Sequence, residues 1–197
     1  MTKNELDEIK KNVFELANNC HDQHCLGHLN RVAANAQKAI YILNLENKID
    51  QNLLQAICFL HDLTYFQKKQ KSKAFTYLFE RKIIKKLLIS FLKQKNISSK
   101  EKQIILNACS RHPHSFPFHR LNKTQDIYTK VLQDSDTLDF FGQHRIFQFS
   151  DMTKKSFYAP VYQKISDKLV AFGIKNLKNY LNYPVLYDRI FLAKNNN

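Results

Sequence analysis

At the centre of the chain lies the stretch DQNLLQAICFLHD, residues 50–62. Its apolar side chains recur at the three- and four-residue spacing of one helix face, at Leu53, Leu54, Ile57 and Leu60. Asp50 suits the N-cap of such a helix, because its carboxylate can accept a hydrogen bond from a free backbone N–H. The stretch therefore predicts a buried helix that ends at the adjacent pair His61-Asp62, where both side chains can turn toward one point.

Similar spacing on both sides of this stretch predicts further helices. A first helix, which should end near Asn18-Asn19, is expected to bury Leu6, Ile9, Val13 and Leu16. A long central helix is expected to bury Phe75, Leu78, Phe79, Ile83, Leu87 and Phe91. A helix after Pro160 is expected to bury Val161, Ile165, Leu169 and Phe172. Ser98 and Glu101 have the spacing of a capping box, for a helix that should stop before Pro113. With 3 glycines and 4 prolines, few turns can need positive φ. We expect an all-α fold.

Length and composition bound the class of protein. With 197 residues and 44% hydrophobic content, the chain can bury one core, and no linker rich in proline or glycine divides it. We expect one compact helical bundle over residues 1–197, with the motifs in about 20–150 and packing helices in about 160–193. The 4 cysteines form no CxxC pair, and no secretory signal or membrane-spanning apolar run is present. A cytoplasmic protein without a membrane span is therefore expected.

The net charge is +14, which favours anionic partners such as a small phosphorylated substrate or a nucleic acid. The lysines are spread over several segments, so a solvated basic surface explains the charge more simply. No helix-turn-helix, RNP-type or zinc-knuckle pattern supports a dedicated nucleic-acid enzyme. The sequence leaves the oligomeric state open.

Groups that can bind a metal come from separate segments of the chain. They are His28, the pair His61-Asp62, and the run Asp134-Ser-Asp136-Thr-Leu-Asp139. His28 lies four residues before the apolar Val32, and Asp136 lies four residues after the apolar Leu132. Residues one helical turn apart share a helix face, so both side chains are expected to face the interior. Burying such groups is costly unless they are paired or bound to a cation. Together they form a mixed nitrogen and oxygen ligand set that can enclose one divalent metal.

The order of these groups resembles the H…HD…D signature of the HD superfamily of metal-dependent phosphohydrolases, and most closely its small single-domain bacterial members. The resemblance rests on Gly27-His28-Leu29-Asn30-Arg31-Val32, on Phe59-Leu60-His61-Asp62-Leu63 and on Leu132-Gln133-Asp134-Ser135-Asp136-Thr137-Leu138-Asp139. It implies an HD-like helical bundle that hydrolyses a phosphoester, most simply of a nucleotide or another small phosphorylated metabolite. The implied metal ligands are His28, His61, Asp62 and Asp136. Two imidazoles and two carboxylates leave positions open on Mn, Fe or Mg, and Zn also fits.

The resemblance also implies roles for neighbouring residues. Asp62 would hold the reacting water as well as the metal, and His112 or His114 would be an additional active-site histidine. Outer-shell or structural positions are implied for His24, Arg31, Asp134 and Asp139, with Arg31 either anchoring an acidic group or forming a structural ion pair. By charge and position, the candidate phosphate-binding residues are Lys68, Lys69, Arg111, His114 and Arg120.

The chain departs from its relatives after the His-Asp pair. Members with a nucleotidase site often carry an acidic residue in this region, whereas Thr64 and Tyr65 stand here. Either another group such as His112 takes that role, or the chain is a catalytically silent HD-fold module that binds a nucleotide or another polyanion. A structural zinc site within Cys20-His21-Asp-Gln-His24-Cys25 is a further alternative, although no downstream CxxC or HxxxH completes it.

Overall fold

The computed structural model describes residues 1–17, 26–66, 73–112, 124–142 and 159–193, and every regular element in these ranges is helical. The longer helices are α1 (Lys3–Ala17), α2 (Leu26–Ile42), α3 (Gln51–Leu60), α4 (Lys73–Lys93), α5 (Ser99–Arg111), α6 (Ile127–Phe140) and α8 (Ala159–Tyr180). Two short elements complete them: the 3₁₀ turn η1 (Leu63–Phe66) and the π-helical η2 (Tyr187–Leu192). The predicted all-α fold is confirmed.

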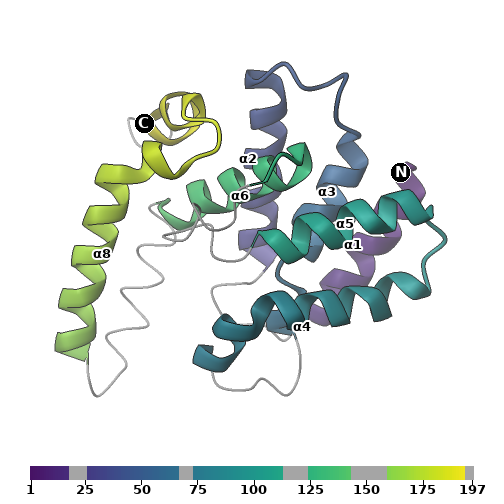
Figure 1. The fold of residues 1–197 in the computed structure, drawn as a ribbon, viewed down its shortest axis with the longest axis horizontal. Helices are drawn as coiled ribbons and strands as arrows, with labels where there is room; N and C mark the ends of the chain where they lie inside the picture. Colours follow the sequence, from purple (N-terminus) through teal and green to yellow (C-terminus); the bar gives the residue numbers. More distant parts are fainter. Residues whose placement is uncertain (18–25, 67–72, 113–123, 143–158, 194–197) are drawn as a thin grey trace.

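Helix α3 lies at the centre of the arrangement. It packs against α1, α2, α5 and α6, and α6 crosses α2 and packs against it (Figure 1). On the far side of α5, α4 packs against α5 and η1. Seven of the ten α3 residues are buried, so the helix is apolar on nearly all sides and its polar C-terminal end is held deep inside the bundle.

Side-chain hydrogen bonds cap the N-termini of α3 and α5 at the residues that the sequence predicts. Asp50 accepts a hydrogen bond from the backbone N–H of Leu53 at 3.0 Å, which caps α3. Ser98 and Glu101 form a complete capping box at the start of α5. Helix α6 begins after Asp126, whose carboxylate accepts from the backbone N–H of Thr129. These caps fix the positions of the helices that carry the site residues.

The most buried row of α4 lies one residue away from the expected one, whose members Leu87 and Phe91 are partly buried against the core. Phe79 is 41% exposed, whereas the fully buried apolar side chains in the described part of the helix, from Phe79 onward, are Ile84, Leu88 and Leu92. Successive residues of a helix are about 100° apart, so the expected row lies beside the row that is fully buried. The same buried face carries Glu80, which is only 4% exposed.

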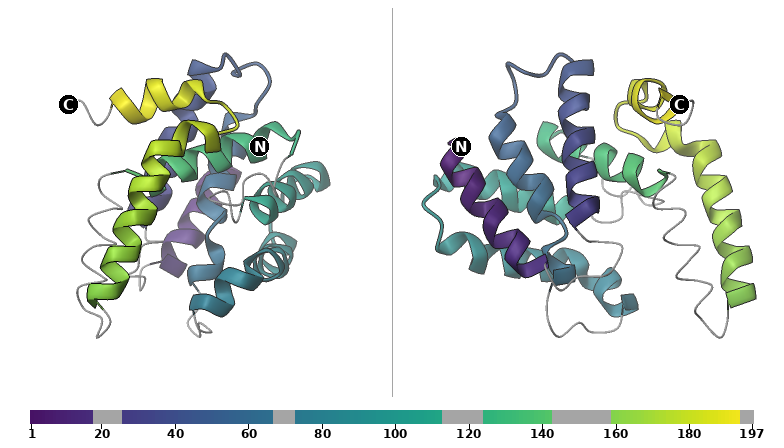
Figure 2. Two further views of the ribbon diagram at one scale, coloured as in Figure 1. Left: turned by 60° about the vertical axis from the view of Figure 1, so that its left-hand side comes forward. Right: turned by 180° about the vertical axis from the view of Figure 1, so that it is seen from behind.

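Two further expected core positions are exposed, and both lie on terminal helices. Leu16 of α1 is 45% exposed, and Phe172 of α8 is 52% exposed, while Leu177 and Leu181 are buried. Figure 2 shows that α8 meets the rest of the bundle at its C-terminal end, where η2 follows and contacts α2 and α6. The side chains of the other expected α8 stripe residues lie outside the described part of the chain.

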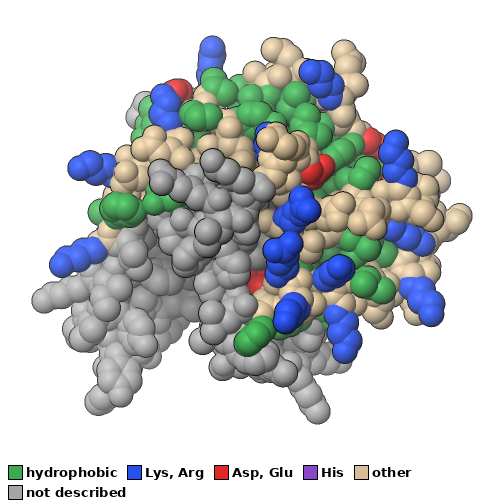
Figure 3. Space-filling model, viewed as in Figure 1, with side chains coloured by type: hydrophobic (Ala, Val, Ile, Leu, Met, Phe, Trp, Pro, Cys, Tyr) green, Lys and Arg blue, Asp and Glu red, His purple; other side chains and the backbone are tan. Residues whose placement is uncertain are grey.

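The surface in Figure 3 carries lysine and arginine side chains across most of the described face, interspersed with apolar patches and few acidic groups. The basic residues on this face are scattered, which agrees with the spread of lysines along the sequence. Among the described residues, no helix combines the length and the apolar content that crossing a membrane requires.

Candidate metal centre

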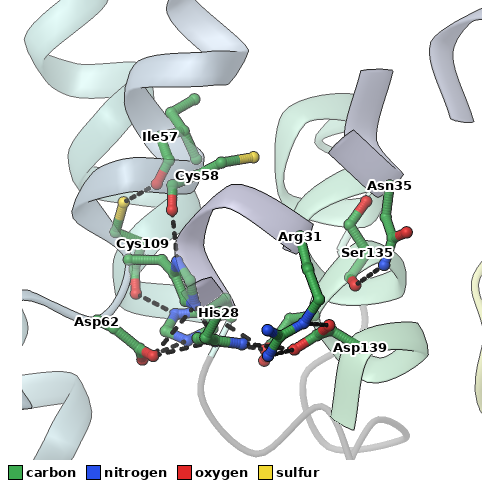
Figure 4. Close-up of polar contacts among 12 residues, drawn as sticks. His28, Arg31, Asn35, Ile57, Cys58, Asp62, Cys109, Ser135 and Asp139 are labelled. Carbon is green, nitrogen blue, oxygen red and sulfur yellow. Dashed lines mark hydrogen bonds and ion pairs between the residues drawn. The ribbon is translucent and has the colours of Figure 1, made fainter. Parts of the chain in front are cut away.

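The predicted donors meet at the lower end of α3. His28 lies in the first turn of α2, His61 is the C-cap of α3, Asp62 follows it, and Asp136 lies in α6. His28, His61 and Asp62 are 1%, 0% and 3% exposed, and the Asp136 side chain is 21% exposed. Figure 4 shows His28 between Asp62 on one side and Asp139 on the other. The site is therefore closed on the side of the histidines and open to solvent at Asp136.

The ligand atoms have the spacing of a coordination shell. His28 Nε2 lies 3.3 Å from His61 Nε2, 3.2 Å from Asp62 Oδ2 and 3.4 Å from Asp136 Oδ1. His61 Nε2 lies 3.4 Å from Asp62 Oδ2 and 3.9 Å from Asp136 Oδ1. With metal–ligand bonds of about 2.1 Å, neighbouring ligands are about 3.0 Å apart in an octahedron and about 3.4 Å apart in a tetrahedron. A divalent ion fits between these atoms with small adjustments.

An ion pair behind His28 sets its orientation. His28 Nδ1 lies 2.7 Å from Asp139 Oδ2, and Arg31 Nε donates to Asp139 Oδ1 at 2.6 Å. Burial disfavours charge on His28, but its hydrogen bonds with Asp139 and Asp62 prevail and raise its pKa to about 9. Burial likewise works against the Asp139 carboxylate, yet His28 and Arg31 lower its pKa to about 2. Asp139 thus holds one ring nitrogen while His28 Nε2 faces the site. Arg31 forms a structural ion pair.

His61 is oriented by the backbone instead. Its Nδ1 donates to the carbonyl oxygen of Cys58 at 2.7 Å, because a carbonyl can only accept. His112, the C-cap of α5, repeats this geometry, and its Nδ1 donates to the carbonyl oxygen of Cys109 at 2.9 Å. With Nδ1 as the donor, the neutral form of either ring has its lone pair on Nε2, the atom that faces the site. A ring oriented in this way is suited to metal binding.

His112 lies beside the predicted ligands. Its Nε2 is 4.0 Å from Asp62 Oδ1, and its ring stands edge-on to that of His61 with centroids 4.8 Å apart. Burial and the neighbouring His61 lower the pKa of His112 to about 4, so its imidazole is neutral at physiological pH. The structure therefore brings His112 to the site as an acceptor or ligand.

Glu80 is the site residue that sequence reasoning missed. Its carboxyl group lies close to Asp62 and His112: one ligand atom from each of the three residues lies within 4.8 Å of the others. Burial, and then the charges of Asp62 and Asp136, raise the pKa of Glu80 to about 9, while the Tyr65 hydroxyl donates a hydrogen bond to it. Glu80 lies four residues before Ile84, so the spacing Ile84–Leu88–Leu92 could have placed it on the buried face.

No carboxylate stands at Thr64 or Tyr65, but the buried Glu80 lies close to Asp62. Thr64, in the region where relatives often carry an acidic residue, is 3% exposed, and its hydroxyl makes no hydrogen bond with the described residues. An acidic group is nonetheless present beside Asp62, supplied by α4.

Two other predicted residues lie away from the donors. Asp134 accepts hydrogen bonds from the backbone N–H groups of Asn182 and Tyr183 at 2.7 and 2.8 Å, so it fastens α6 to the segment after α8. Arg111 is exposed at the end of α5 and donates to the Thr124 hydroxyl at 3.4 Å. The remaining predicted residues lie outside the described part of the chain: Cys20, His21, His24, Cys25, Lys68, Lys69, His114 and Arg120.

The described donors form three groups whose ligand atoms lie within 4.8 Å of one another: His28, His61 and Asp62; His61, His112 and Asp136; Asp62, Glu80 and His112. Imidazole nitrogens combined with carboxylate oxygens are a ligand set for a divalent cation. The buried His and Asp residues can therefore hold a divalent metal. No protein-family model, no curated protein and no solved structure matches this chain.

Proposed function

We propose that this protein is a metal-dependent phosphohydrolase of the HD type that acts on a nucleotide or another small phosphorylated metabolite. The observation that carries the proposal is the set of ligand atoms contributed by His28, His61, Asp62 and Asp136, in which the carboxylate oxygens lie 3.2–3.9 Å from the imidazole Nε2 atoms. These residues come from three helical segments in the order H…HD…D. Their spacing and chemistry suit one divalent ion with coordination positions left open.

When bound, the ion supplies a more acidic water and a positive charge beside a phosphoryl oxygen. Asp139 and the Cys58 carbonyl orient the two imidazoles toward it, so these ligands do not reorganise on binding. Asp62 Oδ2 faces His28 and His61, while Asp62 Oδ1 faces His112 and lies where the reacting water can be held. Solvent reaches the site on the side of Asp136, which is where we place the substrate.

Charge supports an anionic substrate. The chain carries a net charge of +14, and on the described part of the face in Figure 3 lysine and arginine side chains outnumber acidic ones. A positive surface raises the local concentration of phosphorylated molecules and speeds their encounter with the protein. The donor set favours Mn or Fe over Mg, because imidazole is a softer ligand than the oxygens that Mg prefers. Zn also fits this set of ligands.

The test begins with metal content measured by elemental mass spectrometry after the protein is stripped and reloaded with Mn, Fe, Mg or Zn. We expect specific binding in the wild type and its loss in Asp136→Ala. The matched control is Asp7→Ala, because Asp7 is an exposed aspartate of α1 with a side chain 55% exposed. Loaded protein is then screened for phosphate release from nucleotides and sugar phosphates, and activity should disappear in His61→Ala.

The same experiment separates the second candidate, a catalytically silent module that binds a nucleotide or another polyanion. The charge of +14 and the absence of an acidic residue at Thr64 and Tyr65 favour this candidate. Bound metal with no turnover of any phosphoester, together with saturable nucleotide binding, would establish it and contradict hydrolysis. Absence of specific metal in the wild type would contradict the metal centre itself.

A further inference from the structure

Helices α4 and α5 carry a large share of the positive charge of the chain. Residues 79–112, which cover α4 from Phe79 onward and all of α5, contain nine lysines and arginines and two glutamates, a net charge of +7. By contrast, α1 contains three lysines and four acidic residues. Half of the net charge of +14 therefore lies on two helices that pack against each other.

The outer face of α4 is basic and carries no exposed acidic group. Of the two glutamates, Glu80 is buried on the inner face of α4, and Glu101 is held in the capping box of α5. In Figure 3, several lysine and arginine side chains lie over the lower right of the described face, where Figure 1 places α4 and α5. The exposed cations of α4 pair with no carboxylate among the described residues; they are Arg81, Lys82, Lys85, Lys86 and Lys93.

Two exposed apolar side chains share this outer face. Phe79 is 41% exposed and Ile89 is 51% exposed. Together with Lys82, Lys86 and Lys93 they follow spacings of three and four residues, so all five lie in one row along the helix. At a rise of 1.5 Å per residue, the row is about 21 Å long. Helix α4 thus presents an outward ridge on which lysines and apolar groups are interspersed.

We propose that the outer face of α4 binds an anionic phospholipid surface, with the helix axis parallel to the plane of the bilayer. The lysine ammonium groups contact the lipid phosphates, while Phe79 and Ile89 enter the boundary between the headgroups and the acyl chains. The long lysine stems allow this, because they can lie along apolar surface while their charged ends stay in water. The inference goes beyond the proposed function and does not depend on the metal centre.

The apolar residues of the row favour a lipid surface over a nucleic acid. A phosphate backbone is bound by cations and hydrogen-bond donors, and unpaired bases add stacking on aromatic rings. The Ile89 side chain can do neither, although it lies in the row between Lys86 and Lys93. Its removal from water at a bilayer surface is favourable. A partner that offers both negative charge and apolar contact matches the whole row.

The experiment measures co-sedimentation of the full chain with vesicles. Wild type is expected to bind vesicles made of equal parts phosphatidylglycerol and phosphatidylcholine, and not vesicles of phosphatidylcholine alone. Binding should weaken at high salt, because salt screens exposed charges. Each lysine near an anionic leaflet strengthens binding about fivefold, so the α4 double variant, Lys82→Gln with Lys86→Gln, should bind about 25-fold more weakly. Loss of apolar contact in Ile89→Gln should weaken binding about fivefold.

The matched control is Lys38→Gln with Lys48→Gln. It removes the same charge from exposed positions in α2 and in the segment between α2 and α3. In Figure 1 that segment lies at the top of the view and α4 at the bottom. The control should bind the anionic vesicles within about twofold of wild type, since charges held away from the membrane are screened. The salt and lipid comparisons use wild type alone, so they hold even if a variant were to misfold.

Three results would overturn the proposal. One is a wild type that does not bind the anionic vesicles. Another is an equal loss of binding in both double variants, which would show that total charge, and not the face of α4, determines binding. The third is unchanged vesicle binding in Ile89→Gln together with tighter binding of single-stranded RNA that the α4 double variant loses; this would assign the face to a nucleic acid. Metal content is measured separately, so none of these results decides the proposed function.

Discussion

Two walls of the metal centre hold the same kind of ligand in different ways. The charged wall, on α2 and α6, consists of His28, Arg31 and Asp139, and orients its imidazole with a buried ion pair. The carbonyl wall, on α3 and α5, consists of His61 and His112, each held by the backbone carbonyl three residues earlier. Side chains build the first wall, and the ends of helices build the second. Substitution of a side chain can remove the contacts of the charged wall. The contacts of the carbonyl wall are made by backbone oxygens, so they depend on where α3 and α5 end.

The charged wall should therefore be the more sensitive to substitution. In Asp139→Asn, His28 loses a charged acceptor and Arg31 its partner, so we expect metal affinity to fall by about 10–100-fold. We also expect the free energy of unfolding of the metal-free protein to fall by about 2–3 kcal/mol. This loss is smaller than that for a fully buried ion pair, because the Arg31 side chain is 25% exposed and solvent screens the pair. Calorimetric Mn²⁺ titration and urea unfolding measure these effects. Asp188→Asn, at an exposed aspartate, provides the control.

An unchanged affinity in Asp139→Asn would contradict the role given to the charged wall. It would mean that packing alone fixes the His28 ring. A large loss of stability without a loss of affinity would assign Asp139 to the fold and not to the site. The two measurements together therefore distinguish a group that positions a ligand from one that only stabilises the bundle.

The sequence named residues of both walls, but it anticipated a side-chain contact only for the charged wall, where an ion pair of Arg31 was one of two alternatives. His28, Arg31 and Asp139 all lie within stretches whose order could be recognised, and the helical period placed His28 and Asp136 inward. The all-α fold, the capped starts of α3 and α5 and the end of α5 before Pro113 were also predictable, because capping and periodicity are local properties. The carbonyl contacts of His61 and His112 depend on helix-end geometry, which the sequence does not specify to one residue.

Glu80 shows why the rest of the site was not predictable. Helix α4 has apolar residues on more than one face, and the pattern led to the stripe that contains Phe79 and Ile83. Which face turns inward depends on how α5 and η1 pack against it, and that is decided by tertiary contacts. A glutamate four residues before a buried isoleucine looks like a surface group until the helix is rotated by one position. An acidic residue on an ambiguous stripe is thus a signal worth testing.

A neutral contact between α2 and α6 tests whether the charged wall depends on the ion pair alone. Asn35 is 1% exposed, and its side-chain amide donates to the Ser135 carbonyl oxygen at 3.1 Å. We expect Asn35→Ala to lower the free energy of unfolding by about 1 kcal/mol, the usual net value of one buried hydrogen bond. Urea unfolding measures the loss, with Asn107→Ala on the exposed face of α5 as control. A loss equal to that of Asp139→Asn would make the ion pair no more important than this amide.

The carbonyl wall should show the smallest effect on metal binding. Cys58 contacts His61 through its backbone carbonyl oxygen, so Cys58→Ala keeps the hydrogen bond that orients the ring. We expect the affinity for Mn²⁺ to change by less than about twofold, although the removed sulfur costs about 1 kcal/mol of stability because Cys58 is fully buried. Titration of this variant beside Asp139→Asn compares the two walls directly. A tenfold loss of affinity in Cys58→Ala would show that packing around the thiol, and not the end of α3, positions His61.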